Sequence, residues 1–206
     1  MIITKITQQA KNNSRASIFV DDKFYMGVNK FVVFRLGIKT GQKLTPVLIE
    51  QLNSENESNN IWEYSLWLLS KAPKSVYQMK QKLMQKFPDQ EVGETIDRLV
   101  ADGLLDDDRL AQQLAERHYR EQLKSRIEAT AHIIAKGIDG SIAKEACQIL
   151  DSDYEQLTVV KLVEFKLRNK QISKDNITKT SQYLARKGFS YMAIKLVVAD
   201  LGRDVE

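Results

Sequence analysis

Cysteine, proline and long apolar runs are all scarce in this sequence. One cysteine and three prolines occur among 206 residues, so no disulfide can form within the chain. Cys147 lies beside Ala146 and Leu150, where we expect it to be a small buried hydrophobe. No run approaches the roughly 18 apolar residues of a membrane-spanning helix, and the first residues lack the apolar block of a signal peptide. We therefore expect a cytoplasmic protein.

Motifs for catalysis, nucleotide binding and metal binding are missing as well. The sequence has no Walker loop, dinucleotide-binding glycine pattern or paired cysteines. Its two histidines, His118 and His132, have no nucleophile at catalytic spacing, and we expect both at the surface or half-buried. The aspartates at 106–108 are too closely spaced for a calcium loop. We interpret Asp106 as the cap of a helix whose first turn contains the next two aspartates. The sequence predicts neither an enzyme nor a bound cofactor or metal.

The charged residues are unevenly distributed, although the formal net charge is only +4. Residues 1–52 have 8 basic and 3 acidic side chains, residues 53–155 have 13 and 19, and residues 156–206 have 10 and 5. Basic ends around an acidic middle favour an anionic partner at the ends. The same pattern is equally typical of lysines and arginines that only solvate helix faces.

The first 52 residues predict a small β-rich domain. Three runs rich in β-branched and aromatic residues are separated by polar turns, which predicts a hairpin or a three-stranded meander. These runs are Ile2–Thr7, Ala16–Val20 and Phe24–Val28, with turns at 11–14 and 21–23. A short helix should follow at 30–36, closed by Gly37, and another should begin near Pro46. Residues 53–60 contain no apolar side chain, so we predict a linker there.

The rest of the chain predicts an internal repeat. Capping boxes begin at Ser75 and Ser125, 50 positions apart, and the apolar positions that follow them superimpose without a gap. A third copy follows with one residue of slippage, because residues 130–138 resemble 180–189. Repeats of this length indicate stacked supersecondary units. We predict a mainly α-helical protein with three three-helix repeats, at 61–107, 108–155 and 156–206, in an elongated, curved array. The expected helices are 61–71, 75–87, 91–102, 108–124, 126–136, 141–150, 156–168, 175–187 and 190–201.

Several of these stretches resemble the RecX family of regulatory proteins. The resemblance includes the helix opened by Ser75 with Lys82-Leu83 near its end, and the stretch from Asp102 through Ala111, DGLLDDDRLA. Lys136-Gly137-Ile138 and Lys187-Gly188-Phe189 are similar to the second and third repeats of that family. The sequence departs from the family at Leu110, where an aromatic residue is frequent, and at 122–126, where the family is rich in glycine and arginine.

The resemblance implies a partner and a mode of action. RecX proteins bind the RecA filament on single-stranded DNA, lie along its groove, and inhibit its ATPase, strand-exchange and co-protease functions. They thereby modulate recombination, DNA repair and the SOS response. The resemblance thus implies a monomeric protein that binds RecA, with weak direct DNA binding and no cofactor. Two alternatives stay open, namely a helix-turn-helix DNA-binding protein and a helical-repeat scaffold for another partner.

Basic side chains of the second and third repeats are the candidate contacts with RecA or DNA. Arg117, Arg120 and Lys124 have the spacing of one helix face, where they either bind a partner or are solvated. Basic residues are also dense around 168–170. The full candidate set is Arg117, Arg120, Lys124, Arg126, Lys136, Lys166, Arg168, Lys170, Arg186 and Lys187.

Aromatic residues of the helical region offer a second candidate surface. Trp62, Tyr64 and Trp67 could form a platform for base stacking, but their spacing beside leucines favours core packing. We apply the same interpretation to Phe165, Tyr183 and Tyr191.

Overall fold

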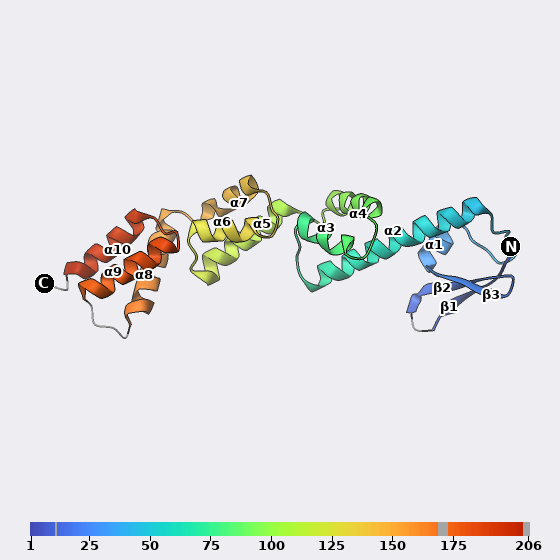
Figure 1. Cartoon of the computed structure of the whole chain (residues 1–206), viewed down its shortest axis with the longest axis horizontal. Coiled ribbons are helices and arrows are strands. Elements are labelled where there is room, and N and C mark those ends of the chain that lie inside the picture. Colours follow the sequence, from blue (N-terminus) through green and yellow to red (C-terminus); the bar gives the residue numbers. More distant parts are fainter. Residues whose placement is uncertain (11, 169–172, 204–206) are drawn as a thin grey trace. The chain divides into compact units, whose positions relative to one another are not determined.

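The structure is a computed structural model that describes residues 1–10, 12–168 and 173–203, without the side chains of 90, 120, 122 and 200–203. The described part contains a three-stranded sheet followed by ten α-helices (Figure 1). It forms two compact units, Met1–Pro73 with Met79–Asp102, and Lys74–Gln78 with Gly103–Glu206. None of the helices in the described ranges is long and apolar enough to cross a membrane.

The predicted meander is confirmed. Strands β1 (Ile3–Gln9), β2 (Asn12–Val20) and β3 (Lys23–Asn29) pair antiparallel in the order β1-β2-β3. Alternate residues of β2 point into the core, so Ile18 is fully buried there. The β2–β3 turn consists of Asp21 and Asp22, both with positive φ, which suits the twist of a tight hairpin. The turn before β2 is shorter than predicted, since β2 already begins at Asn12, and Lys11 lies outside the described residues.

The short helix predicted after the sheet is confirmed. Helix α1 spans Lys30–Arg35, and the Asn29 side chain caps it by accepting from the amide of Phe31 at 2.8 Å. Gly37 follows in the left-handed region, with φ of 61°. Val32 of α1 joins the buried core of the sheet.

The predicted linker at 53–60 is wrong, because these residues are the middle of a long helix. Helix α2 spans Pro46–Lys71, so the helix expected near Pro46 and the helix expected at 61–71 are one. Thr45 caps this helix, since its hydroxyl accepts from the amide of Leu48 at 3.2 Å. The linker prediction assumed that a segment without apolar residues has nothing to hold it in place.

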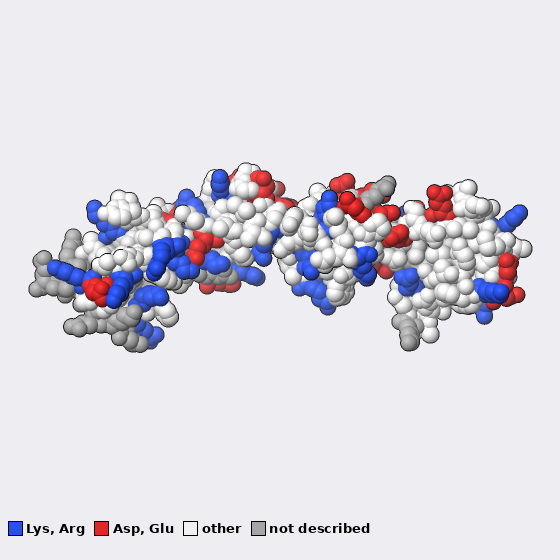
Figure 2. Space-filling model, viewed as in Figure 1, with Lys and Arg blue, Asp and Glu red and all other residues white. Residues whose placement is uncertain are grey.

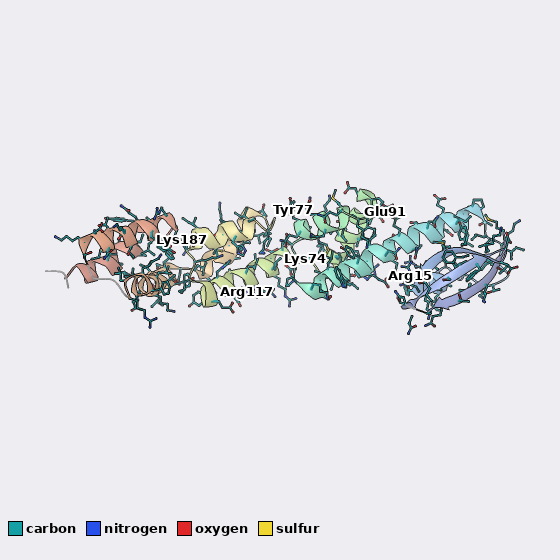
Figure 3. The ribbon with its side chains drawn as sticks, turned by 60° about the horizontal axis from the view of Figure 1, so that its bottom comes forward. Arg15, Lys74, Tyr77, Glu91, Arg117 and Lys187 are labelled. Carbon is teal, nitrogen blue, oxygen red and sulfur yellow. The ribbon has the colours of Figure 1, made fainter. Side chains whose placement is uncertain are left out.

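Along this part of α2, hydrogen bonds rather than buried apolar side chains hold the helix against the sheet. The buried Asn56 side chain accepts from the backbone amide of Asn29 at 3.2 Å, and Asn29 donates to Glu63 at 2.7 Å. Arg15 of β2 donates to Asn60 at 2.9 Å, and Figure 3 shows Arg15 beside α2. The polar composition of 53–60 therefore reflects a polar interface between α2 and the sheet.

Two further helices complete the first repeat. Helix α3 spans Val76–Met84 and α4 spans Asp89–Ala101, close to the predicted 75–87 and 91–102. Helix α4 packs against α2, and both α3 and α4 have fully buried side chains. The buried apolar residues of these three helices in the first unit are Ile61, Leu68, Met79, Leu83, Val92, Ile96 and Leu99.

The second and third repeats also have three helices each. The second contains α5 (Asp107–Arg117), α6 (Arg126–Ile134) and α7 (Gly140–Ala146), and the third contains α8 (Ser152–Leu167), α9 (Lys174–Arg186) and α10 (Tyr191–Arg203). Cys147 is buried in the core of the second repeat, as expected. The three tandem three-helix repeats are confirmed, and the curvature of their array stays a prediction.

The predicted helix 108–124 is too long. Helix α5 ends at Arg117, a π-helical turn η1 (His118–Gln122) follows, and Leu123 then adopts a left-handed conformation with φ of 46°. A left-handed residue ends a right-handed helix because its backbone angles are not helical, and for leucine this conformation costs roughly 1–2 kcal/mol. A short 3₁₀ turn, η2 (Cys147–Ile149), similarly follows α7.

Candidate partner-binding surface

A serine hydrogen bond of the same kind occurs twice within the second unit. The Ser125 hydroxyl accepts from the amide of Glu128 at 3.1 Å and donates to the backbone carbonyl of Lys187 at 2.6 Å. The Ser75 hydroxyl accepts from the amide of Gln78 at 3.1 Å and donates to the carbonyl of Lys136 at 2.5 Å. Both predicted capping serines therefore also bind the last turn of a helix that lies 61 or 62 residues further along the chain.

A glycine follows each of these two lysines. Gly137 and Gly188 both have φ of 82°, in the left-handed region that favours glycine. A Cβ on Gly137 would overlap the Tyr77 side chain, and a Cβ on Gly188 would lie 3.0 Å from Ile127. The lysine–glycine pairs thus end a helix and allow the start of an earlier helix to approach closely.

Two candidate cations, Arg126 and Lys187, already donate hydrogen bonds within the chain. Lys187 donates to the Glu128 carboxylate at 2.7 Å, and this hydrogen bond raises the pKa of Lys187. Arg126 donates through Nε to the carbonyl of Leu150 at 2.6 Å. Figure 3 shows Lys187 where the yellow ribbon of the second repeat meets the orange ribbon of the third. Lys187 therefore joins α9 to α6, whereas Arg126 joins the start of α6 to the turn that ends the second repeat.

The predicted basic face of Arg117, Arg120 and Lys124 is wrong as a helix face. Arg117 is the last residue of α5 and is exposed, with Glu121 3.9 Å away. Lys124 follows the left-handed Leu123, so it no longer belongs to the helix, and it is half-buried. The side chain of Arg120 lies outside the described residues. The i, i+3, i+7 spacing implied a shared face only if the helix continued to 124.

A tyrosine of the third repeat holds this turn in place. The hydroxyl of Tyr154 is 3.0 Å from the carbonyl of His118 and 3.1 Å from the carbonyl of Lys124, so its single proton is shared between two acceptors. The Tyr154 ring also stacks on that of Tyr119, with centroids 5.0 Å apart. Burial raises the pKa of Tyr154.

The two histidines form a pair that the sequence did not predict. His118 Nε2 and His132 Nδ1 are 2.8 Å apart, and His118 is only 1% exposed, which corrects the surface expectation for this residue. Burial lowers the pKa of His132, and the positive charges of Lys124 and Lys136 lower it further. The spacing of 14 residues gave no signal, because it depends on how α5 and α6 pack.

The remaining candidate basic side chains differ in their exposure and in their contacts within the chain. Lys166 is half-buried, with Nζ 4.1 Å from the centre of the Tyr183 ring, and Lys136 is also half-buried. Arg168 follows α8, Arg186 ends α9, and both are exposed. Within the described ranges, neither arginine forms an ion pair. Lys170 lies outside these ranges. Blue side chains, with some red among them, gather over the third repeat and its border with α6 in Figure 2.

The three aspartates have the structural roles that the sequence predicted. Asp106 caps α5 by accepting from the amide of Arg109 at 2.8 Å. Asp107 accepts from the amide of Val76 at 2.9 Å, and burial raises the pKa of Asp107. Considering only the residues described, no group of three or more histidine, cysteine or acidic residues is placed to hold a metal ion.

The core interpretation of the aromatic residues holds only in part. Trp62, Tyr64 and Tyr183 are half-buried, whereas Trp67 is 52% exposed. Phe165 and Tyr191 were also expected in the core, but they are 73% and 74% exposed. Aromatic spacing beside leucines therefore did not separate the buried face of a helix from its exposed face, since α2 has leucines on both.

Comparisons with protein families and known proteins agree along most of the chain. Residues 1–45 match the family model described as the regulatory protein RecX N-terminal domain, and residues 62–99 match the RecX first three-helix domain. The sequence is 32% identical to the regulatory protein RecX of Clostridioides difficile (strain 630), over 97% of this chain and 95% of the relative. It is 30% identical to that of Bacillus subtilis (strain 168), over 93% of this chain and 74% of the relative.

Solved structures show the same fold. A crystal structure of regulatory protein RecX superimposes with a TM-score of 0.79 over 95% of this chain and 98% of the other, at 23% identity. RecX from Lactobacillus salivarius gives a TM-score of 0.67 over 72% of this chain and 98% of the other, at 21% identity. With two family models and full-length relatives in agreement, this chain belongs to the RecX family of regulatory proteins.

Proposed function

We propose that this protein binds the RecA nucleoprotein filament on single-stranded DNA and inhibits its ATPase, strand-exchange and co-protease activities. The observation that supports the proposal is membership of a regulatory family along nearly the whole chain. Acting in the cytoplasm, as a monomer and without a cofactor, such an inhibitor would regulate DNA repair and the SOS response.

The repeated architecture suits a repeating partner. Two successive repeats start their second helix with the same serine, and each serine binds the lysine–glycine turn of another repeat. Three-helix repeats of similar structure offer similar surfaces more than once along the chain. A filament also offers identical surfaces more than once, so linked contacts to neighbouring protomers would strengthen one another.

Arg117, Arg168 and Arg186 are the best placed of the candidate cations. Each has an exposed side chain, and the contact of Arg117 with Glu121 is a solvent-exposed pair of the weak kind. Arg126 and Lys187 already donate to partners within the chain. We therefore propose that the first three contact the filament, that Lys187 acts by holding α9 against α6, and that Arg126 acts within the second repeat.

Charge reversal at two of these arginines tests the proposal. A variant with Arg168→Glu and Arg186→Glu should co-sediment less with preassembled RecA filaments, with circular dichroism unchanged. The matched control, Lys144→Glu with Lys195→Glu, changes the net charge equally at two other exposed lysines of α7 and α10. Equal loss of binding in both variants would show only a net-charge effect. No binding by the unaltered protein would contradict the proposed function itself.

The alternative of a helix-turn-helix DNA-binding protein makes a different prediction. Such a protein binds duplex DNA without RecA and prefers particular sequences. Anisotropy titrations with duplexes of different sequence should instead give weak, sequence-independent binding by this chain. A sequence preference would favour the alternative.

A further inference from the structure

The aromatic residues at the end of α2 form an ordered, partly exposed platform. The Trp67 ring stacks on the Tyr64 ring, with centroids 5.5 Å apart and an angle of 15° between the planes. The Phe87 ring meets Tyr64 edge-on at 5.8 Å. Trp67 is 52% exposed, so one side of its indole is supported by Tyr64 while much of the rest faces solvent. The stacked pair therefore presents a ring that is held in place by Tyr64 and is accessible to solvent.

Two lysines of this platform place their ammonium groups over its rings. Lys86 Nζ is 4.4 Å from the centre of the Tyr64 ring, and Lys71 Nζ is 5.7 Å from that of Trp67. For the described residues, neither ammonium group is within ion-pair distance of a carboxylate. In Figure 2, basic side chains gather over the C-terminal end of α2, whereas acidic ones lie over α4. We define the aromatic–lysine face as Tyr64, Trp67, Lys71, Lys86 and Phe87.

We propose that the aromatic–lysine face binds single-stranded nucleic acid, with a base stacked on Trp67 and neighbouring phosphates paired with Lys71 and Lys86. A nucleotide strand repeats a flat π-face beside a negative charge, and the face offers a flat ring beside positive charges. In a duplex the base faces are covered by neighbouring base pairs, so stacking on Trp67 selects single strands. A protein segment with an aromatic and two acidic residues fits the charges less well, because it must supply three side chains at the required positions.

The inference does not depend on the proposed function, because it concerns nucleic acid in the absence of RecA. The full-length protein is titrated into a labelled oligothymidylate of about 20 nucleotides, long enough for a typical single-strand site. Thymine cannot self-pair in such a strand, so the bases are available. We expect saturable binding that weakens as salt rises, together with quenching of tryptophan fluorescence.

Variants locate the binding at the face. Trp67→Ala should weaken binding roughly tenfold, because stacking of one base typically contributes about that much. Trp67→Phe should retain most of the affinity, since it keeps a ring. Replacing Lys71 and Lys86 with glutamine should reduce the slope of log K against log salt by about 1.4, at roughly 0.7 per phosphate contact. Circular dichroism and urea unfolding check that each variant folds.

A matched control comes from the third repeat. Tyr191 is 74% exposed and has Lys195 Nζ 5.9 Å from its ring centre, but it lies outside the aromatic–lysine face. Tyr191→Ala and Lys195→Gln should leave binding of the oligonucleotide unchanged. The inference is overturned if the unaltered protein does not bind the single strand at low salt, if Trp67→Ala binds as well as Trp67→Phe, or if duplex binds equally well. It is also overturned if Trp67→Ala impairs RecA inhibition alone, which would make the face a protein contact.

Discussion

The hydroxyl of Ser125 lies 2.6 Å from the backbone carbonyl of Lys187, to which it donates a hydrogen bond. The serine is fully buried and also accepts from the amide of Glu128, so one hydroxyl caps α6 and satisfies the end of α9. Ser75 and Lys136 repeat this relationship at 2.5 Å. Ser125 thus both caps α6 and links the second repeat to the third.

Removing this hydroxyl should cost more than removing an ordinary cap. Ser125→Ala loses the cap, worth about 1 kcal/mol, and removes the donor from the part-buried carbonyl of Lys187, at about 1–3 kcal/mol more. Ser173→Ala is the matched control, because Ser173 caps α9 through the amide of Asn176. Urea unfolding should show the larger loss for Ser125→Ala. Equal losses would mean that the bond to Lys187 contributes nothing measurable.

The glycine of the lysine–glycine turn should tolerate no side chain. Gly137→Ala introduces both a strained positive φ and overlap with Tyr77, so we expect a loss of about 2–4 kcal/mol. Gly103→Ala has a similar φ of 67° but nothing within 4 Å of the added Cβ, so it should lose only about 1–2 kcal/mol. Adding Tyr77→Ala to Gly137→Ala should recover part of the loss. Without any recovery, the overlap would not be the cause.

Acid should destabilise the fold through His132. The pKa of His132 is lower in the folded protein than the usual value of about 6.5 in an unfolded chain, so the unfolded state binds more protons. The stability that the fold has with His132 neutral is therefore fully present above about pH 6.5, and it is lost as the pH falls below that value. The thermal midpoint should drop more steeply on acidification in the unaltered protein than in His132→Gln. Parallel curves for the two proteins would contradict this role.

The polar interface of α2 gives a fourth prediction. Asn56→Ala leaves the buried backbone amide of Asn29 without its acceptor, which should cost about 1–3 kcal/mol. Asn53→Ala, on the exposed side of the same helix, should be neutral or slightly stabilising, because alanine favours helix more than asparagine does. Chemical denaturation measures the free energy of unfolding of both variants, and only Asn56→Ala should show a loss. If Asn56→Ala proved neutral, the polar interface would not hold α2 to the sheet.

The repeats could be predicted because each one shows the same periodic apolar positions, and two of them begin a helix with a capping serine. Ser75 and Ser125 stand 50 residues apart, and both cap helices in the structure. Segment 53–60 could not be predicted in the same way, because its partners are backbone and side-chain groups of strands 27 and 45 residues earlier. Composition records the polarity of such a segment but not the groups that it binds.

The candidate site was predictable only as a region. Basic residues are dense in the third repeat, as expected, but sequence spacing did not show that Lys187 pairs with Glu128 or that Arg126 binds a carbonyl. Nor did it show that the π-turn and Leu123 separate Lys124 from Arg117. Whether a cation is free depends on tertiary contacts, which a pattern of charges does not contain.

The rate of RecA's ATPase on single-stranded DNA, measured with increasing amounts of this protein at fixed salt, tests the proposed function most directly. We predict that the rate falls at substoichiometric amounts of the unaltered protein, and that Arg168→Glu with Arg186→Glu requires more protein for the same fall. The control with Lys144→Glu and Lys195→Glu should act like the unaltered protein. An unchanged rate, with filaments still intact by light scattering, would contradict regulation of RecA by this chain.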